Sequence, residues 1–130
     1  MDTSLSWKPE PFMPSQRYTV QGQDASLYEL YIAIALQEFN LEFEFQYAIE
    51  GGWTRAGGQV IDFMVHTAPL YTPLEVNEEY WHRDPSLEIY LADRIRAVLG
   101  PDYAEMLAVW GEECDTQDKA RQSVRRLFIL

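Results

Sequence analysis

Hydrophobic and polar positions alternate along the first half of the chain with two different periods. Apolar side chains recur at helical spacing at Leu27, Leu30 and Ile34, which predicts a helix over about 26–39. Residues 42–47 then alternate with a period of two, and a second apolar segment covers 60–65. We interpret these two segments as strands of one hairpin, because a glycine-flanked loop joins them.

The pattern in the second half of the chain predicts two more strands and two helices. A strand is expected at about 72–77, and Pro85 opens a helix that ends at Gly100. The continuous apolar run 106–110 predicts a strand buried on both faces. Thr116 is expected to cap the last helix, which carries apolar side chains at Ala120, Val124, Leu127 and Phe128.

The predicted order is therefore α-β-β-β-α-β-α over residues 24–130. A hairpin followed by a helical crossover favours an α/β domain with a mixed sheet of four main strands and helices on both faces. A length of 130 residues and a hydrophobic content of 47% suit one domain with its own core.

The first 23 residues differ from this pattern. Prolines at 9, 11 and 14 alternate with Trp7, Phe12 and Tyr18, so neither a helix nor a sheet is expected there. We predict an extended N-terminal arm over 1–23 that contacts another subunit, in a homo-oligomer or a larger assembly.

The single cysteine, Cys114, excludes an intrachain disulfide and suits a reducing compartment. The sequence contains neither a membrane-spanning apolar run nor the basic and apolar start of a signal peptide. We therefore expect a cytoplasmic protein that does not contact a membrane.

A net charge of −11 argues against a protein that coats nucleic acid. It leaves room for a nuclease, because an acidic centre attracts phosphate once it holds a metal ion. Arg121 and Arg125 share a face of the last helix, and Arg55 lies at the predicted hairpin tip, so these three are candidate DNA contacts. The two helical arginines are equally explained by stabilisation of a helix C-terminus.

Two carboxylates lie within predicted neighbouring strands. Asp62 interrupts the apolar segment 60–63, and Glu75 does the same in the next strand. A carboxylate in such a place is costly unless it is paired or binds metal, and oxygen ligands suit Mg²⁺ or Mn²⁺.

In these segments the chain resembles a known group of enzymes. The similar elements are Ser26-Leu27-Tyr28-Glu29, Phe45-Gln46, Val60-Ile61-Asp62-Phe63, Leu74-Glu75-Val76-Asn77, Tyr80-Trp81-His82 and Val109-Trp110. In order and spacing they resemble the PD-(D/E)xK nucleases, in particular the small branch related to very-short-patch repair endonucleases and short phage or mobile-element nucleases. The resemblance implies a restriction-endonuclease-like fold and Mg²⁺- or Mn²⁺-dependent cleavage of DNA.

The same resemblance implies a role for five residues. Asp62 and Glu75 match the acidic metal ligands, and Glu29 matches a helical Glu that joins the metal shell through water. His82 matches a His beside the scissile phosphate. Asn77 stands where a Lys is commonest, which is a departure from the family pattern.

Each residue also has a structural explanation. Ser26 and Glu29 fit a capping box, Asp62 a hydrogen-bonded strand residue, Asn77 a turn residue and His82 an ordinary loop residue. Three functions follow: a metal-dependent DNA endonuclease, a nuclease fold kept as a structural or interaction subunit (in a phage particle, for example), or a subunit active only with a DNA-binding partner.

Overall fold

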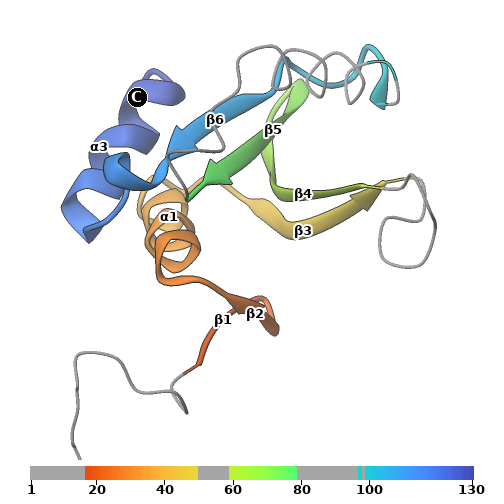
Figure 1. The fold of residues 1–130 in the computed structure, drawn as a ribbon. Coiled ribbons are helices and arrows are strands. Elements are labelled where there is room, and N and C mark those ends of the chain that lie inside the picture. Colours follow the sequence, from red (N-terminus) through yellow and green to blue (C-terminus); the bar gives the residue numbers. More distant parts are fainter. Residues whose placement is uncertain (1–16, 50–58, 79–96, 98) are drawn as a thin grey trace, which may run out of the picture.

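A four-stranded sheet covered by two helices forms most of the described part of the chain (Figure 1). The computed structural model describes residues 17–49, 59–78, 97 and 99–130. The elements, in chain order, are β1 (Tyr18–Val20), β2 (Gln23–Ala25), α1 (Leu27–Glu38), β3 (Phe43–Ile49), β4 (Gln59–Thr67), β5 (Leu70–Asn77), β6 (Leu107–Trp110), a 3₁₀ turn (Gly111–Glu113) and α3 (Gln117–Leu127).

The main sheet is mixed, with the order β3-β4-β5-β6. Its first three strands form an antiparallel meander, and β6 pairs in parallel with β5. This confirms the predicted α/β class, the hairpin and the four-stranded mixed sheet. The specific restriction-endonuclease-like topology remains a prediction.

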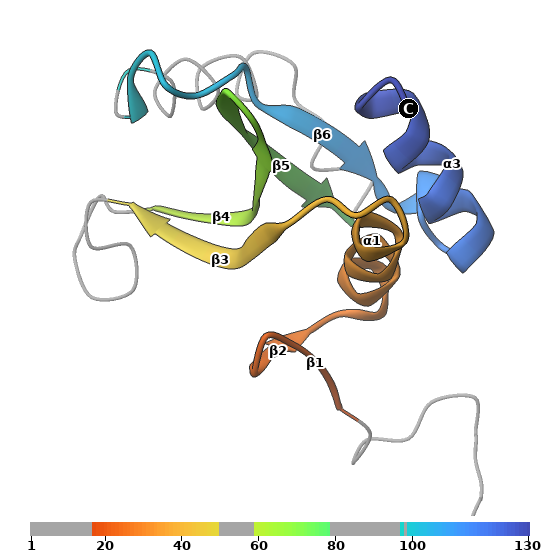
Figure 2. The same ribbon diagram turned by 180° about the vertical axis from the view of Figure 1, so that it is seen from behind.

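Helices α1 and α3 pack against each other and cover one face of the sheet (Figure 2). Phe63, with no exposed surface, lies at the centre of this core, and its ring centroid is 5.3 Å from that of Phe43 and 5.0 Å from that of Phe45. Ile32 and Val124 bring the two helices into the same cluster.

A smaller apolar cluster lies on the other face, where Ile61 and Met64 are buried. Tyr47, Leu99, Tyr103 and Met106 pack against them. Of the helix predicted over 85–100, Ala97 and Leu99 are helical and Gly100 follows with a φ of 86°. The rest of that segment lies outside the described residues.

Both described helices begin at the predicted residues. Ser26 caps α1, and the Thr116 hydroxyl accepts a hydrogen bond from the Lys119 N–H at 3.1 Å at the start of α3. These side chains satisfy backbone N–H groups that have no partner inside the helix.

The end of the predicted arm is folded, which corrects the expectation for residues 18–23. Strands β1 and β2 pair across Gln21 and Gly22, whose φ angles of 51° and 80° match a tight hairpin turn. The Gln21 amide then donates to the Phe43 carbonyl (2.7 Å) and accepts from the Phe45 N–H (2.8 Å), so it attaches the hairpin to the edge of β3. Residues 1–16 lie outside the described part, and their contact with a partner stays a prediction.

Strand β6 is also less buried than its apolar run predicted. It lies at the edge of the sheet, and Val109 is its one fully buried residue. An edge strand has a neighbour on one side alone, so Leu107, Ala108 and Trp110 keep some exposure.

Cys114 is fully buried behind β6, with its Sγ 3.4 Å from the Trp110 carbonyl. Burial raises the pKa of this thiol to about 12, so it stays protonated and unreactive at neutral pH. Among the residues that the structure describes, no helix has the length and apolar character needed to cross a membrane.

The packing around Phe63 gives a stability prediction. Phe63→Ala leaves a cavity between two other phenylalanines, and the free energy of unfolding should fall by about 3–5 kcal/mol in chemical denaturation. Leu70→Ala, at a position that is 38% exposed, is the control and should change it by about 0.5 kcal/mol or less. Equal losses in both variants would contradict a core centred on Phe63.

Candidate functional site

The site is built where β4 and β5 stop pairing with each other. Their ladder ends at the Phe63–Leu74 pair, and Asp62 and Glu75 occupy the next position on each strand. The Asp62 N–H donates to Glu75 Oε2 at 3.1 Å, and the Val76 N–H donates to Asp62 Oδ2 at 2.8 Å. Two carboxyl groups thus take the place of the backbone carbonyls of a continued ladder.

Where the two strands separate, each still has a partner on its other side. The first residues of β4 stay paired with the end of β3, from Ile61 opposite Tyr47 to Gln59 opposite Ile49. The last residues of β5 pair with β6, from Leu74 opposite Leu107 to Asn77 opposite Trp110. In both ribbon views β4 bends along its length and its beginning runs away from β5 (Figures 1 and 2). We call this opening in the sheet, occupied by the Asp62 and Glu75 carboxyls, the fork.

The two carboxyl groups in the fork interact strongly. Burial, the charge of Asp62 and a hydrogen bond with the Asp62 side chain raise the pKa of Glu75 to about 9, and the charge of Glu29 adds to the effect. With a pKa raised this far, Glu75 retains its proton at neutral pH. The sequence prediction that Asp62 and Glu75 face each other from neighbouring strands agrees with this geometry.

Glu29 approaches the fork from the first turn of α1 and is 9% exposed. Its Oε1 accepts the Ser26 N–H at 2.9 Å, and its own N–H donates to the Ser26 hydroxyl at 3.1 Å, which completes the capping box. Burial raises the pKa of Glu29, and the charges of Asp62 and Glu78 contribute. Glu29 thus caps the helix and also adds its carboxyl to the electrostatics of the fork.

Glu78, to which the family resemblance assigns no functional role, also belongs to this acidic group. The Ser26 hydroxyl donates to Glu78 Oε2 at 2.7 Å, which ties the residue after β5 to the start of α1. The backbone of Glu78 packs directly against Gly111, because a Cβ at Gly111 would lie 2.8 Å from the Glu78 carbonyl oxygen. Sequence carries one hint: a capping-box serine accepts through its oxygen and keeps a hydroxyl hydrogen to donate.

Asn77 is two residues beyond Glu75 on β5, so the two side chains share a face of the strand. The amide of Asn77 can donate and accept hydrogen bonds but has no charge to offset the carboxyls. His82, the other residue expected to contact phosphate, lies outside the described residues, as does Arg55.

The donors in the fork fit a small divalent cation. They are carboxylate oxygens, the preferred ligands of Mg²⁺ and Mn²⁺, and the charged groups that act on Glu75 are themselves acidic. A bound cation would take the place of the Glu75 proton. Within the described residues no three His, Cys, Asp or Glu side chains converge in a ligating arrangement. A cation in the fork would therefore have Asp62 and Glu75 as its protein ligands and water in the rest of its shell.

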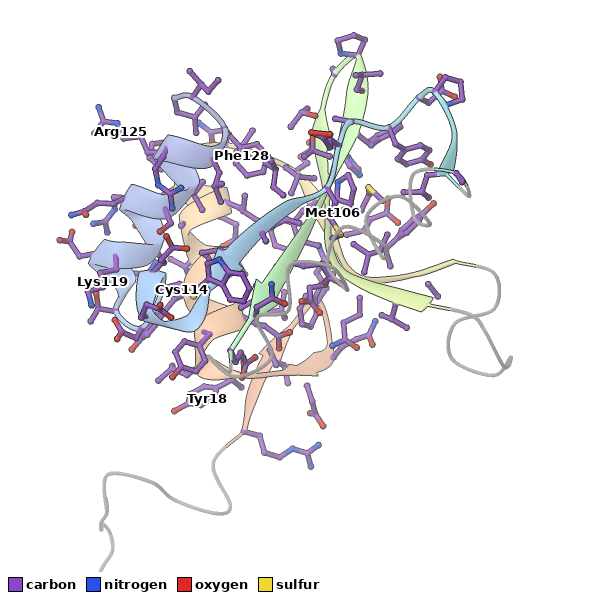
Figure 3. The ribbon with its side chains drawn as sticks, turned by 45° about the horizontal axis from the view of Figure 1, so that its top comes forward. Tyr18, Met106, Cys114, Lys119, Arg125 and Phe128 are labelled. Atoms are coloured by element: carbon purple, nitrogen blue, oxygen red, sulfur yellow. The ribbon has the colours of Figure 1, made fainter. Side chains whose placement is uncertain are left out.

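The two arginines of α3 that were expected to contact DNA have partners within the chain. Arg121 pairs with Glu38 at 3.0 Å and Asp118 at 2.8 Å, and Arg125 donates to the Leu130 carbonyl at 3.4 Å. Lys119 and Arg125 project outward from α3 (Figure 3).

A polar groove of about 500 Å³ lies elsewhere, between the end of α1 and the start of β3. Gln37, Asn40 and Glu42 line it together with His66, whose Nε2 is 3.2 Å from Glu44 Oε2. The groove does not include the carboxyls of the fork. The contacts of His66 with Glu42 and Glu44 account for its place on β4.

Comparison of the chain with models of protein families, with curated proteins and with solved structures finds no match.

The raised pKa of Glu75 predicts an unusual dependence of stability on pH. Between about 4.5 and about 9 the unfolded chain has lost the Glu75 proton and the folded chain keeps it. The folded state binds more protons there, so this group's contribution to the free energy of unfolding falls as pH rises through the window. Glu75→Gln imitates the protonated acid, because its amide can accept from the Asp62 N–H and donate to the Asp62 carboxylate.

We therefore expect the Tm of Glu75→Gln, relative to that of the parent chain, to rise steadily from pH 5 to pH 9 in the presence of a chelator. Asp24→Asn, an exchange at an exposed position of β2 whose carboxylate pairs with Arg17, is the control and should keep a constant difference. Parallel Tm profiles for Glu75→Gln and the parent chain would mean that Glu75 is ionised in the fold.

Proposed function

We propose that this chain is a metal-dependent deoxyribonuclease of the PD-(D/E)xK type, with Asp62 and Glu75 as its metal ligands. The observation that carries the proposal is the fork, where two carboxyls meet at the point of strand separation and each accepts a backbone N–H of the facing strand. A structural role alone would be served better by a hydrophobic or amide pair, because buried like charges are costly.

The order of elements supports the proposal. Helix α1 precedes three antiparallel strands, β6 then pairs in parallel with β5, and α3 follows. This order is compatible with the core that the family resemblance implies. Glu29 on α1 and Asn77 on β5 approach the same end of the sheet as the carboxyl pair.

A bound Mg²⁺ or Mn²⁺ would supply positive charge for a phosphodiester and lower the pKa of a bound water. Asp62 and Glu75 would hold that ion through their oxygens, and Glu75 would give up its proton. Glu29, oriented by Ser26, would accept hydrogen bonds from water in the fork. The Asn77 amide would orient water or phosphate by hydrogen bonding, where other members of the family use a lysine.

The ion pairs of α3 favour one version of this function, in which a partner contributes the DNA-binding surface. Arg121 is engaged by Glu38 and Asp118, and Arg126 by Glu113. With a net charge of −11, the chain has little positive surface to offer DNA. A nuclease fold retained as a structural or interaction subunit is the alternative, which the absent lysine at position 77 favours.

Asp62→Asn tests the proposed function. The variant keeps an acceptor for the Val76 N–H but removes one anionic ligand. Cleavage of duplex, nicked, branched or single-stranded DNA with Mg²⁺ or Mn²⁺ should fall by at least about 100-fold, since even the loss of a group that orients a metal ligand costs 10–100-fold. The rise in Tm that Mn²⁺ produces in the parent chain should disappear with it.

Asp24→Asn is the matched control, because Asp24 is exposed and pairs with Arg17 on the β1–β2 hairpin. It should retain both cleavage and the Mn²⁺-induced rise in Tm. A parent chain that binds Mn²⁺ but cuts none of the four DNA forms would favour a subunit that needs a partner. A parent chain that does neither would favour the structural alternative.

A further inference from the structure

Gln46 has a backbone conformation that is rare for its residue type. Its φ is 57°, in the left-handed region, although it lies in the middle of β3. A non-glycine residue with such a φ is strained, and strands require the opposite sign. Strain of this kind persists where the surrounding structure requires it.

The register places Gln46 opposite Asp62. The β3–β4 pairs run from Phe43–Val65 to Phe45–Phe63 and resume at Tyr47–Ile61, without an inserted residue. The one position missing from this ladder is therefore Gln46–Asp62. Both strands are interrupted at the same point, and that point contains the candidate ligand.

The interruption reverses the faces of both strands. Phe45 and Tyr47 would share a face in a regular strand, but Phe45 packs under α1 and α3, and Tyr47 packs on the other face with Ile61. The same reversal separates Phe63 from Ile61 on β4. Asp62 therefore lies at the turning point of its strand, and its N–H and carboxyl are directed to β5 and not to β3.

We propose that Gln46 is a positioning residue, whose left-handed backbone turns β4 so that Asp62 meets Glu75 across the fork. The role belongs to the backbone of Gln46 and rests, for its catalytic meaning, on the proposed metal-dependent nuclease. A residue that tolerates a positive φ, such as glycine, would keep this backbone conformation at position 46. A β-branched residue would disfavour the conformation, because its Cβ substituents clash with the backbone at positive φ.

The test compares the full chain with Gln46→Val, Gln46→Ala and Gln46→Gly, and uses Ala48→Val as a matched control. Ala48 is exposed on the same strand and pairs regularly with Val60. Two quantities are measured: the ¹H–¹⁵N shifts of the Asp62 and Val76 amides, which donate to the two carboxyls, and the affinity for Mn²⁺. Tm values for all variants give the effect on folding.

Gln46→Val should move both amide signals and weaken Mn²⁺ binding about 10–100-fold, the usual cost of losing a group that orients a metal ligand. Gln46→Gly and Ala48→Val should leave the signals and the affinity as in the parent chain, and Gln46→Gly should not lower the Tm. Gln46→Ala should fall between Gln46→Gly and Gln46→Val. If Gln46→Val does not fold, the contrast between alanine and glycine decides the matter.

Unchanged amide signals in the folded Gln46→Val or Gln46→Ala variants would overturn the inference. Loss of the signals in Gln46→Gly would also overturn it, because the side chain would then be responsible. A parent chain that fails to bind Mn²⁺ would count against the proposed nuclease, and the amide shifts would still decide the role of Gln46.

Discussion

Two carboxyl groups that meet in a partly buried place cannot both be ionised without a compensating positive charge, and this constraint governs the centre of the structure. Asp62 and Glu75 meet where β4 and β5 separate and each strand is still paired on its other side. A proton satisfies the constraint in the chain alone, and a divalent cation satisfies it in the proposed function. The surrounding parts, from the Ser26–Glu29 cap to the close contact at Gly111, hold the acidic groups in place around the fork.

Much of the fold is visible in the sequence because the core follows simple periods. Phe43 and Phe45, two residues apart on β3, both face the helices. Ser26 and Thr116 are N-capping residues and mark where the two helices begin. Asp62 and Glu75 stand out because each is an acidic residue inside an apolar strand. What the pattern could not predict depends on single backbone angles. Alternation of Phe43, Phe45 and Tyr47 implies one face for all three, and nothing in the residue types indicates that Gln46 reverses it. The folding of residues 18–23 likewise depends on the turn at Gln21 and Gly22. It also depends on the Gln21 side-chain amide, which bonds to the backbone of β3 as a neighbouring strand would.

Charged groups in the fork and on α3 have different surroundings. The carboxyls of the fork have acidic neighbours, while the described basic residues of α3 lie largely within ion pairs, such as Arg121 with Glu38. Arg121 thereby links the last helix to the end of the first, and its pKa rises through the hydrogen bond and charge of Glu38. A surface pair of this kind adds little to stability but removes a cation from the set that could meet a polyanion. Counting arginines on a helix face therefore overestimates the positive surface of this chain.

The parallel pairing of β5 with β6 has a consequence for the order in which the chain folds. Strands β3, β4 and β5 follow one another along the chain as an antiparallel meander, whereas β6 pairs with β5 only after a long intervening segment has closed. Closing a longer loop costs more entropy, so contacts of this range form late. Asp62 and Glu75 both belong to the meander, whereas the partner of the end of β5 arrives with β6. We therefore expect the carboxyl pair to form with the meander, and the β5 side of the fork to become fixed when β6 joins the sheet.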